Sequence, residues 1–468
     1  MRYLSQIFQP LITIPKGAKL KNTDITCKSQ KLLLECGLIR PTSAGLFTIL
    51  PLARRAIDKL ENLIHKCLEH VNAQRMSLPS LTSARLWERS GRLDQVGAEL
   101  LMVQDRHNKQ YLLAPTHEEA VTELMADVGP LSYKQLPLLI YQISNKYRDE
   151  LRPKHGLLRA REFQMLDLYG VHADEASAAS VYDDVTGVYR RLFDSLHLPV
   201  HRVSAPPGEM GGSVSHEWQL PAAAGEDTVA VCPSCSHVSL RGPCQRCGSE
   251  TTTLNSIEVG HTFVLGTRYS ECLQARCTPP DSNPTPLVMS CYGIGITRLL
   301  AGSIEHLSSE TSIRWPAPIA PYTALVIGPK EGSKEWLSHN PERVRGVSQL
   351  ITDALGDEEV IIDDRHHLTI GKRLMLADRM GYPYIIVCGR SSTDTPPKYE
   401  LYRSNSGHEE PGPLLLELSP LLEHIKQSQP KLFNKCINSF YVLLFLWKRF
   451  VLLFQCMIHL VLSDHHRP

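Results

Sequence analysis

The feature of the sequence that most constrains the fold is a pair of alternating segments, residues 140–150 and 159–169, on either side of a polar turn. The turn contains proline and glycine, so the pattern predicts two antiparallel strands joined by a long loop. Side chains two positions apart in a strand lie on the same face. One face is therefore expected to carry arginines, carboxylates and rings together: Arg148, Glu150, Arg159, Arg161, Phe163, Met165, Asp167 and Tyr169.

Such a face has the chemistry of a phosphate-binding surface. Arginine forks bind phosphate oxygens, and Phe163 offers a ring on which a base can stack. In a second segment, Gly293 and Gly295 permit a close approach to the backbone, and Arg298 stands where a dinucleotide-binding fingerprint would have a third glycine. We expect the two segments to form one nucleotide site; the alternative is a solvated sheet face held by salt bridges.

The remaining patterns predict two domains in this chain of 468 residues. Residues 28–315 are expected to form an α+β domain, an antiparallel sheet flanked by helices near 52–70, 114–125 and 176–196. A strand is expected at 76–81, and Thr116 with Glu119 resembles a capping box. Beyond a proline-rich linker, strands and helices alternate over 320–427, which predicts an α/β domain.

The two ends of the chain are unusual. Residues 1–27 are expected to form an N-terminal extension, basic and poor in acids like a transit peptide, although a trimmed N-terminus would look similar. Residues 428–468 form a strongly apolar tail interrupted by Lys448 and Arg449. These charges make a membrane span unfavourable, so a packing tail or a non-native splice product is the preferred interpretation.

Composition narrows the class of protein. A formal net charge of +1 argues against binding nucleic acid by bulk electrostatics, but it is compatible with recognition of a folded RNA through placed contacts. Thirteen cysteines are too few for a disulfide scaffold in a chain of this length.

Four of the cysteines form two C-x-x-C pairs within residues 229–250. Cys232 and Cys235 are separated by eight residues from Cys244 and Cys247. This spacing is typical of a small structural zinc site. The alternative is a set of reduced thiols left from an ancestral zinc ribbon.

The segments at 148–163 and 291–298 resemble the second and third signature motifs of class II aminoacyl-tRNA synthetases: Arg148-Asp-Glu150, Arg159-Ala-Arg-Glu-Phe163 and Gly293-Ile-Gly-Ile-Thr-Arg298. The helix near 52–70 and Pro79 resemble the first motif. Five further blocks resemble prolyl-tRNA synthetases: Pro115–Glu119, Ser132–Pro137, Gly211–Glu217, Val259–Gly266 and Cys291–Gly295. Only about 30 residues separate Gly225 from Ile257, which is too few for an editing domain. In this respect the chain resembles the short mitochondrial type of prolyl-tRNA synthetase.

The resemblance assigns roles to the residues that match. Arg148 and Arg298 would act in catalysis. ATP would contact Arg148, Glu150, Arg159, Phe163, Gly293, Gly295 and Arg298. Proline would contact Thr116, Glu118, Arg148, Met165, Asp167, Tyr169 and His261.

The resemblance also implies substrates and partners. ATP and L-proline would be joined with the help of Mg²⁺, and the prolyl group would pass to tRNA(Pro). The chain would act as a homodimer, without a membrane, in the mitochondrial matrix or else in the cytoplasm. Residues 320–427 would bind the anticodon, with Lys372, Arg373 and Arg379 as candidate contacts. Two alternatives remain open: a non-catalytic, nucleic-acid-binding accessory subunit, and a class II enzyme for another small amino acid such as threonine.

Overall fold

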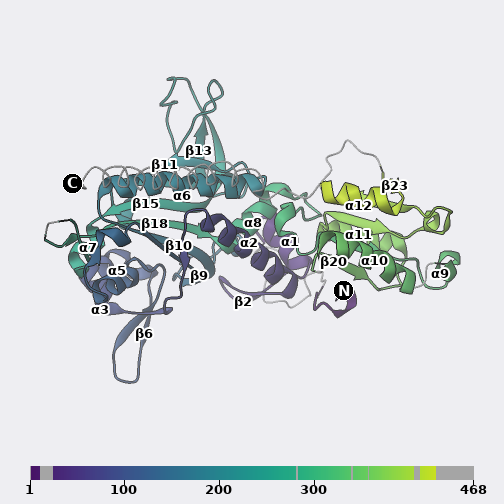
Figure 1. The fold of residues 1–468 in the computed structure, drawn as a ribbon, viewed down its shortest axis with the longest axis horizontal. Coiled ribbons are helices and arrows are strands. Elements are labelled where there is room, and N and C mark those ends of the chain that lie inside the picture. The colour runs from purple at the N-terminus through teal and green to yellow at the C-terminus, as the bar shows by residue number, and fades with distance from the viewer. Residues whose placement is uncertain are drawn as a thin grey trace, which may run out of the picture. The chain divides into compact units, whose positions relative to one another are not determined.

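A computed structural model describes residues 2–10, 25–280, 283–338, 341–356, 358–404 and 412–427 (Figure 1). The apolar tail predicted for residues 428–468 lies outside the described residues, as do residues 11–24 of the predicted N-terminal extension. No helix among the described residues is both long and apolar enough to cross a membrane.

The larger sheet is nine-stranded and almost wholly antiparallel. Its main path runs β11 (His201–Ser204), β12 (Val214–Pro221), β15 (Thr252–Gly266), β18 (Val288–Gly295), β10 (Glu162–His172), β9 (Leu138–Tyr147) and β4 (Gln74–Arg75). Strands β13 (Asp227–Val231) and β14 (Val238–Ser239) attach beside β15. The central β10 lies between β9 and β18, so the predicted strand pair lies next to the second predicted segment. Met165 of β10 is opposite Ser144 of β9 and Gly295 of β18.

Helices flank this sheet as predicted. Helix α6 (Glu175–Ser195) runs along β15 and β18 (Figure 1). Asp174 caps its N-terminus, because the Asp174 carboxylate accepts from the Ser177 amide at 2.7 Å. Helix α2 (Pro51–Glu69) buries the apolar stripe expected from its sequence: Ile57, Leu60, Leu63, Ile64 and Leu68. The other helices of this part are α1 (Lys28–Glu35), α3 (Ala84–Ser90), α4 (Arg92–Val96), α5 (Glu118–Asp127), α7 (Arg268–Leu273) and α8 (Ile296–Leu307).

Small sheets complete this part of the chain. They comprise β2 (Ile39–Ser43) with β3 (Leu46–Ile49); β5 (Leu81–Ser83), β7 (Gln110–Leu113) and β6 (Leu101–Gln104); and β17 (Thr285–Pro286), β16 (Arg276–Thr278) and β8 (Leu131–Ser132). The strand predicted at 76–81 is wrong. Residues 76–80 lie between β4 and β5, and only Leu81 belongs to a strand, as the first residue of β5. The Pro79 carbonyl oxygen lies 3.0 Å from His117 Nε2 instead of joining a ladder.

The α/β arrangement predicted for residues 320–427 is present as a six-stranded sheet. Its order is β1 (Arg2–Tyr3), β20 (Val360–Asp363), β19 (Ala324–Ile327), β21 (Tyr384–Val387), β22 (Tyr399–Arg403) and β23 (Leu414–Leu416). The helices are α9 (Lys334–Ser338), α10 (Pro341–Leu355), α11 (Ile370–Met380) and α12 (Leu418–Gln427). The first four strands are parallel, and β22 and β23 return antiparallel.

Part of the predicted N-terminal extension belongs to this second sheet. Strand β1 pairs parallel with β20, Leu4 is buried, and the Ser5 amide donates to Asp364 Oδ1 at 2.9 Å. Residues 2–5 therefore pack as an edge of the α/β sheet.

One predicted tRNA contact is corrected by burial. Arg373 is fully buried and donates to the carbonyl oxygens of Gly328, at 2.6 Å, and Asp363, at 3.2 Å. It holds α11 against β19 and β20, so it cannot present its guanidinium to RNA. Lys372 is exposed, and Arg379 pairs with Glu35 at 2.6 Å.

A buried histidine at the end of β10 gives this fold a defined pH dependence. His172 is fully buried with Nε2 2.9 Å from Ser290 Oγ, and burial lowers its pKa to about 4. In the unfolded chain its pKa is about 6.5. Between these values only the unfolded chain takes up the proton, so stability falls as pH falls from about 6.5 to about 4, by on the order of 3 kcal/mol.

We therefore expect His172→Gln to lose less stability than the wild type between pH 7 and about 4.5. Urea unfolding at both pH values measures the difference, with His107→Gln, in an exposed turn, as the matched control. Equal losses in wild type and His172→Gln would show that this imidazole does not couple folding to protonation.

Candidate active site

A cavity of about 390 Å³ opens on the sheet face formed by β10, β15 and β18. The beginning of α5, helix α4 and the loop Pro206–Met210 close its other sides. It is lined by Arg92, Val96, Glu99, Pro115, Thr116, Glu118, Arg148, Phe163, Met165, Asp167, Tyr169, Pro206, Pro207, Gly208, Glu209, Met210, Glu258, Val259, Gly260, His261, Phe263, Cys291, Tyr292, Gly293, Gly295 and Arg298.

The alternation of β10 accounts for four of these residues. Phe163, Met165, Asp167 and Tyr169 all line the cavity, as strand parity predicts. The strand-parity rule fails outside the ladder between β9 and β10. Strand β9 ends at Tyr147 and β10 begins at Glu162, so the intervening residues follow a turn, and their directions are set by local contacts.

Glu150 and Arg159 consequently lie apart from the lining residues. Arg159 donates to Glu150 Oε1 at 2.7 Å and to Glu226 Oε2 at 2.7 Å, so its guanidinium bridges the two carboxylates. This pairing lowers the pKa of Glu150, because the Arg159 hydrogen bond stabilises its carboxylate. Both side chains are thus held as ions by each other.

Two arginines stand at one end of the cavity. Arg148 follows β9 directly, and its Cζ lies 5.3 Å from the centre of the Phe163 ring. Arg298, in the first turn of α8, donates to the carbonyl oxygens of Leu158 and Glu258, each at 3.0 Å. Burial, and then the positive charge of Arg298, lower the pKa of Arg148. Two cations held this close favour an anionic ligand between them.

The glycines of β18 leave space beside these cations. Gly293 pairs with Asp167 on one side and His261 on the other. A Cβ added at Gly293 would come no closer than 3.7 Å to other protein atoms. Packing within the protein therefore does not require glycine here, and the space it leaves is available to a ligand. Gly295 is tighter, since its added Cβ would lie 3.2 Å from Arg298 Cβ.

The opposite end carries hydroxyl and carboxylate groups. Thr116 Oγ1 lies 2.8 and 2.7 Å from the two carboxylate oxygens of Glu118, and Tyr169 OH accepts from the His117 amide at 3.0 Å. The predicted capping box is wrong. Helix α5 begins at Glu118, after His117, and Thr116 donates to Glu118 instead of capping the helix.

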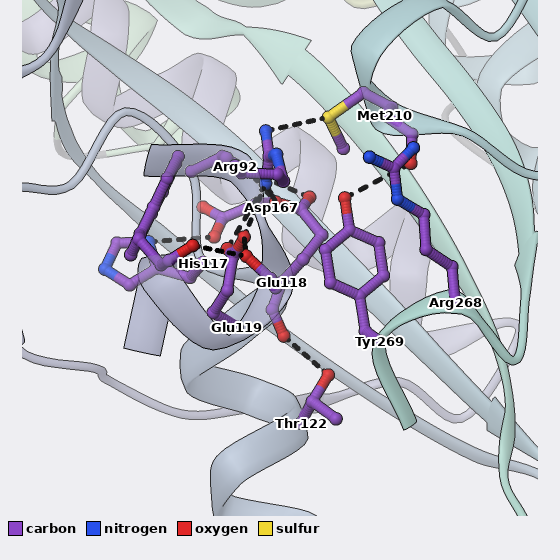
Figure 2. Close-up of polar contacts among 12 residues, drawn as sticks. Arg92, His117, Glu118, Glu119, Thr122, Asp167, Met210, Arg268 and Tyr269 are labelled. Carbon is purple, nitrogen blue, oxygen red and sulfur yellow. Dashed lines mark hydrogen bonds and ion pairs between the residues drawn. The ribbon is translucent and has the colours of Figure 1, made fainter. Parts of the chain in front are cut away.

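Beneath these groups lies a buried ion cluster that the sequence patterns did not reveal. Arg92 Nη1 lies 3.3 Å from Glu118 Oε2 and 3.1 Å from Glu119 Oε1, and Figure 2 shows its guanidinium beside both acids. The Arg92 Cζ also lies 4.6 Å from the Trp87 ring. One cation between two carboxylates leaves one negative charge, which suits a cationic amine bound above Glu118.

A second buried group supports Asp167. Lys146 Nζ donates to Asp167 Oδ1 at 2.6 Å, and Gln142 Nε2 donates to Oδ2 at 3.0 Å. His117 Nδ1 lies 3.5 Å from Oδ2, and Figure 2 shows His117 beside Asp167. Burial would raise the pKa of Asp167, but the His117 contact and the Lys146 charge outweigh it and lower that pKa. Asp167 is therefore a neutralised carboxylate that fixes the cavity floor.

His261 is held at both ring nitrogens. Nε2 lies 2.7 Å from Ser215 Oγ, and Nδ1 lies 2.8 Å from Glu258 Oε1. The imidazole also stacks on Phe263, with ring centres 4.0 Å apart. With both nitrogens engaged by the protein, the His261 ring has a fixed orientation in the cavity wall.

The four cysteines of the two C-x-x-C pairs come together outside the cavity, in a knuckle that extends over residues 232–247. Their sulfur atoms all lie within 4.8 Å of one another, with Cys232 to Cys247 and Cys235 to Cys244 each 3.5 Å apart. A tetrahedral site with zinc–sulfur bonds of about 2.3 Å has sulfur–sulfur edges of about 3.8 Å. The cluster can therefore hold a metal ion.

Comparison with known proteins agrees with this geometry. Residues 101–307 match the family described as tRNA synthetase class II core domain (G, H, P, S and T). The chain is 44% identical over 416 residues to a Homo sapiens protein named probable mitochondrial proline–tRNA ligase, covering 86% of this chain and 87% of that protein.

Two solved structures share the fold. A Giardia lamblia prolyl-tRNA synthetase in complex with prolyl-adenylate matches with a TM-score of 0.71 at 19% identity, covering 84% of this chain and 73% of that one. A Cryptosporidium parvum prolyl-tRNA synthetase complexed with L-proline and AMP matches with a TM-score of 0.69 at 15% identity, covering 85% and 75%. With the human relative, these findings confirm the predicted resemblance: the chain belongs to the proline–tRNA ligases of the mitochondrial type, within the class II aminoacyl-tRNA synthetases.

Proposed function

We propose that this chain activates L-proline with ATP and transfers the prolyl group to the 3′ end of tRNA(Pro) in the mitochondrial matrix. The observation that carries the proposal is the placement of Arg148 in one cavity between a carboxylate-and-hydroxyl end and a second arginine. Proline is itself a carboxylate joined to a cationic amine, and ATP brings the phosphates. One cavity thus offers a partner for each charge of the two substrates.

The proposed binding of proline uses the end beside α5. Thr116 and Glu118 receive the imino nitrogen, and Arg148 receives the carboxylate. The pocket is completed by Met165, Asp167, Tyr169 and His261, which line the same cavity. Because Glu118 is already anchored by Thr116 and Arg92, its carboxylate does not have to be ordered when proline arrives.

The proposed binding of ATP uses the other end. Phe163 stacks beneath the adenine, Glu150 meets its amino group, and Arg159 and Arg298 hold the outer phosphates. Gly293 and Gly295 leave room for the adenylate. Arg159 is held by Glu150 and Glu226, so it would reach the phosphates from a preformed position.

The chemistry needs positioning and charge neutralisation. The proline carboxylate oxygen attacks the α-phosphorus, and the bond to pyrophosphate breaks. The carboxylate is already a nucleophile at neutral pH, so no general base is required, and Arg148 and Arg298 stabilise the added charge of the pentacovalent phosphate. A ribose hydroxyl at the tRNA 3′ end then attacks the prolyl carbonyl, and AMP leaves.

We also propose that Mg²⁺ assists ATP binding, because the phosphate oxygens of ATP are ligands of the kind that this cation prefers. When bound, Mg²⁺ would supply additional neutralisation of the phosphate charge.

The cysteine cluster, by the same reasoning, is proposed to hold structural Zn²⁺, because its four sulfurs have the spacing of a tetrahedral thiolate site. We expect the purified chain to contain about one zinc ion per chain and Cys232→Ser to contain almost none. Metal analysis after removal of loosely bound ions measures this. Equal, negligible zinc in both proteins would contradict the assignment.

The remaining assignments complete the proposal. Residues 28–315 form the catalytic domain and residues 320–427 bind the anticodon, with Lys372 among the exposed candidate contacts. Two copies of the chain form a dimer through the first motif, which includes α2. Sedimentation at several concentrations tests the dimer.

The direct test of the function is charging of tRNA. We expect the purified chain to attach labelled proline to mitochondrial tRNA(Pro) and not to a tRNA for threonine. An accessory subunit would bind tRNA without charging it. The similarity to named ligases and the presence of Arg148, Phe163 and Arg298 in one cavity disfavour that alternative.

A further inference from the structure

The strands that carry the cysteine cluster stand beside the main sheet. Strand β13 pairs with β14 and with the first part of β15, and in Figure 1 this hairpin, residues 227–256, extends away from the rest of the sheet. Its apolar support is small: Val229 and Ala230 are buried, whereas Leu254 is 43% exposed. A hairpin with so little apolar burial depends on an additional constraint for its order.

The cysteines lie at the outer end of this hairpin. Cys232 directly follows β13, whose last residue Val231 pairs with Thr252, the first residue of β15. Two turns close on the cysteines through backbone hydrogen bonds, from the Ser236 amide to Cys232 O and from the Gly248 amide to Cys244 O. A metal ion bound by all four thiolates would therefore clamp β13 to the beginning of β15.

The inner end of the same hairpin reaches the proposed ATP site. Asp227 pairs with Ser256, and β15 then carries Glu258 into the cavity. Glu226, just before β13, binds Arg159 at 2.7 Å, and Arg159 binds Glu150 at 2.7 Å. Glu226 also pairs with Lys154. A Cβ added at Gly225 would overlap the Ser256 backbone, so the position of Glu226 follows β15 closely.

We propose that the metal-bound cysteine cluster positions Arg159 for ATP. The clamp keeps β13 on β15, β13 holds Glu226 in place, and Glu226 fixes the Arg159 guanidinium through their ion pair. In this scheme Arg159 contacts ATP, and Glu226 is a positioning residue that acts through Arg159. The inference rests on the proposed ATP site and on the proposed zinc ion, and it adds a dependence of nucleotide affinity on a metal outside the cavity.

The proposal predicts different effects on the binding of the two substrates, ATP and proline. The groups proposed for proline come from the start of α5, the residue after β9, strand β10 and, for His261, strand β15. Among the described residues Glu226 pairs with Lys154, His155 and Arg159, none of which is proposed to bind proline. Loss of zinc should therefore weaken the binding of ATP and leave the binding of proline almost unchanged. We expect Cys232→Ser to raise the Kd for ATP about tenfold, as for loss of one fixed arginine–phosphate contact, with the Kd for proline within about twofold of wild type.

A double-mutant cycle tests whether Cys232 and Glu226 affect ATP binding through the same contact, Arg159. Glu226→Gln keeps the four cysteines and should raise the Kd for ATP about as much as Cys232→Ser, while zinc content stays at the wild-type level. The variant with both changes should be no weaker than either alone, because both act through Arg159. Arg241→Gln, an exposed change within the knuckle, is the matched control and should keep both zinc and ATP affinity.

Binding calorimetry with ATP alone and with proline alone gives each constant without requiring turnover. Zinc-free Cys232→Ser with wild-type ATP affinity overturns the coupling, as does an additive loss in the double variant. If Cys232→Ser fails to fold, Glu226→Gln decides: unchanged ATP affinity overturns the proposal. Purified wild-type protein that contains no zinc would also overturn the proposal. Proline-dependent exchange of pyrophosphate into ATP, measured separately, reports on the proposed function.

Discussion

Replacing Arg148 by glutamine is expected to reduce the rate of prolyl-adenylate formation by about 10²- to 10³-fold, the usual cost of removing one preorganised group that stabilises developing charge. Arg148 lies in the cavity beside Arg298 and over Phe163. In the proposed complex it touches both the proline carboxylate and the α-phosphate, so its charge matters most when the bond between them forms. Glutamine keeps polar character but removes that charge.

The measurement is proline-dependent exchange of pyrophosphate into ATP at saturating substrates. Arg106→Gln, in the exposed turn between β6 and β7, is the matched control and should exchange at the wild-type rate. Arg148→Lys should recover only part of the loss, because an ammonium lacks the planar fork. Exchange by Arg148→Gln within about threefold of wild type would exclude the proposed role.

Replacing Arg92 by methionine is expected to destabilise the fold by about 3–5 kcal/mol, the typical cost of leaving a buried charge without its partner. Arg92, Glu118 and Glu119 are all buried, and the guanidinium lies within 3.3 Å of both acids. Its removal leaves two carboxylates facing each other. The protein that remains folded should bind proline more weakly, since Glu118 loses an anchor.

Urea unfolding at pH 7 gives the stability, and calorimetry under native conditions gives the Kd for proline. Adding Glu119→Gln to Arg92→Met removes one of the two unpaired carboxylates and should recover part of the stability. A loss below about 1 kcal/mol for Arg92→Met, with no recovery in the double variant, would show that the cluster is not held by this charge.

The sequence predicts the frame of this site well because alternation is a local property. Strands β9 and β10 follow from it, and strand parity brings Phe163, Met165, Asp167 and Tyr169 to one face. The same rule fails between Tyr147 and Glu162, where no ladder fixes the direction of side chains. Glu150 and Arg159 are placed there by their ion pair with each other.

Other features could not be predicted because they depend on tertiary contacts. Thr116 and Glu119 have the spacing of a capping box, but Glu119 turns inward to Arg92 and Ser90, and the helix begins at Glu118. Arg92 is an isolated arginine whose partners lie 26 and 27 residues ahead, at Glu118 and Glu119. Arg373 looks like a surface residue of α11 until the fold encloses it beside β19 and β20.

The central claim is that one cavity joins proline to ATP. Proline-dependent exchange of labelled pyrophosphate into ATP, measured on the purified chain without tRNA against a panel of amino acids, tests it most directly. We predict exchange with proline well above that with threonine or any other amino acid of the panel, and its loss in Arg148→Gln. Exchange with another amino acid but not with proline, or with no amino acid at all, would contradict the account.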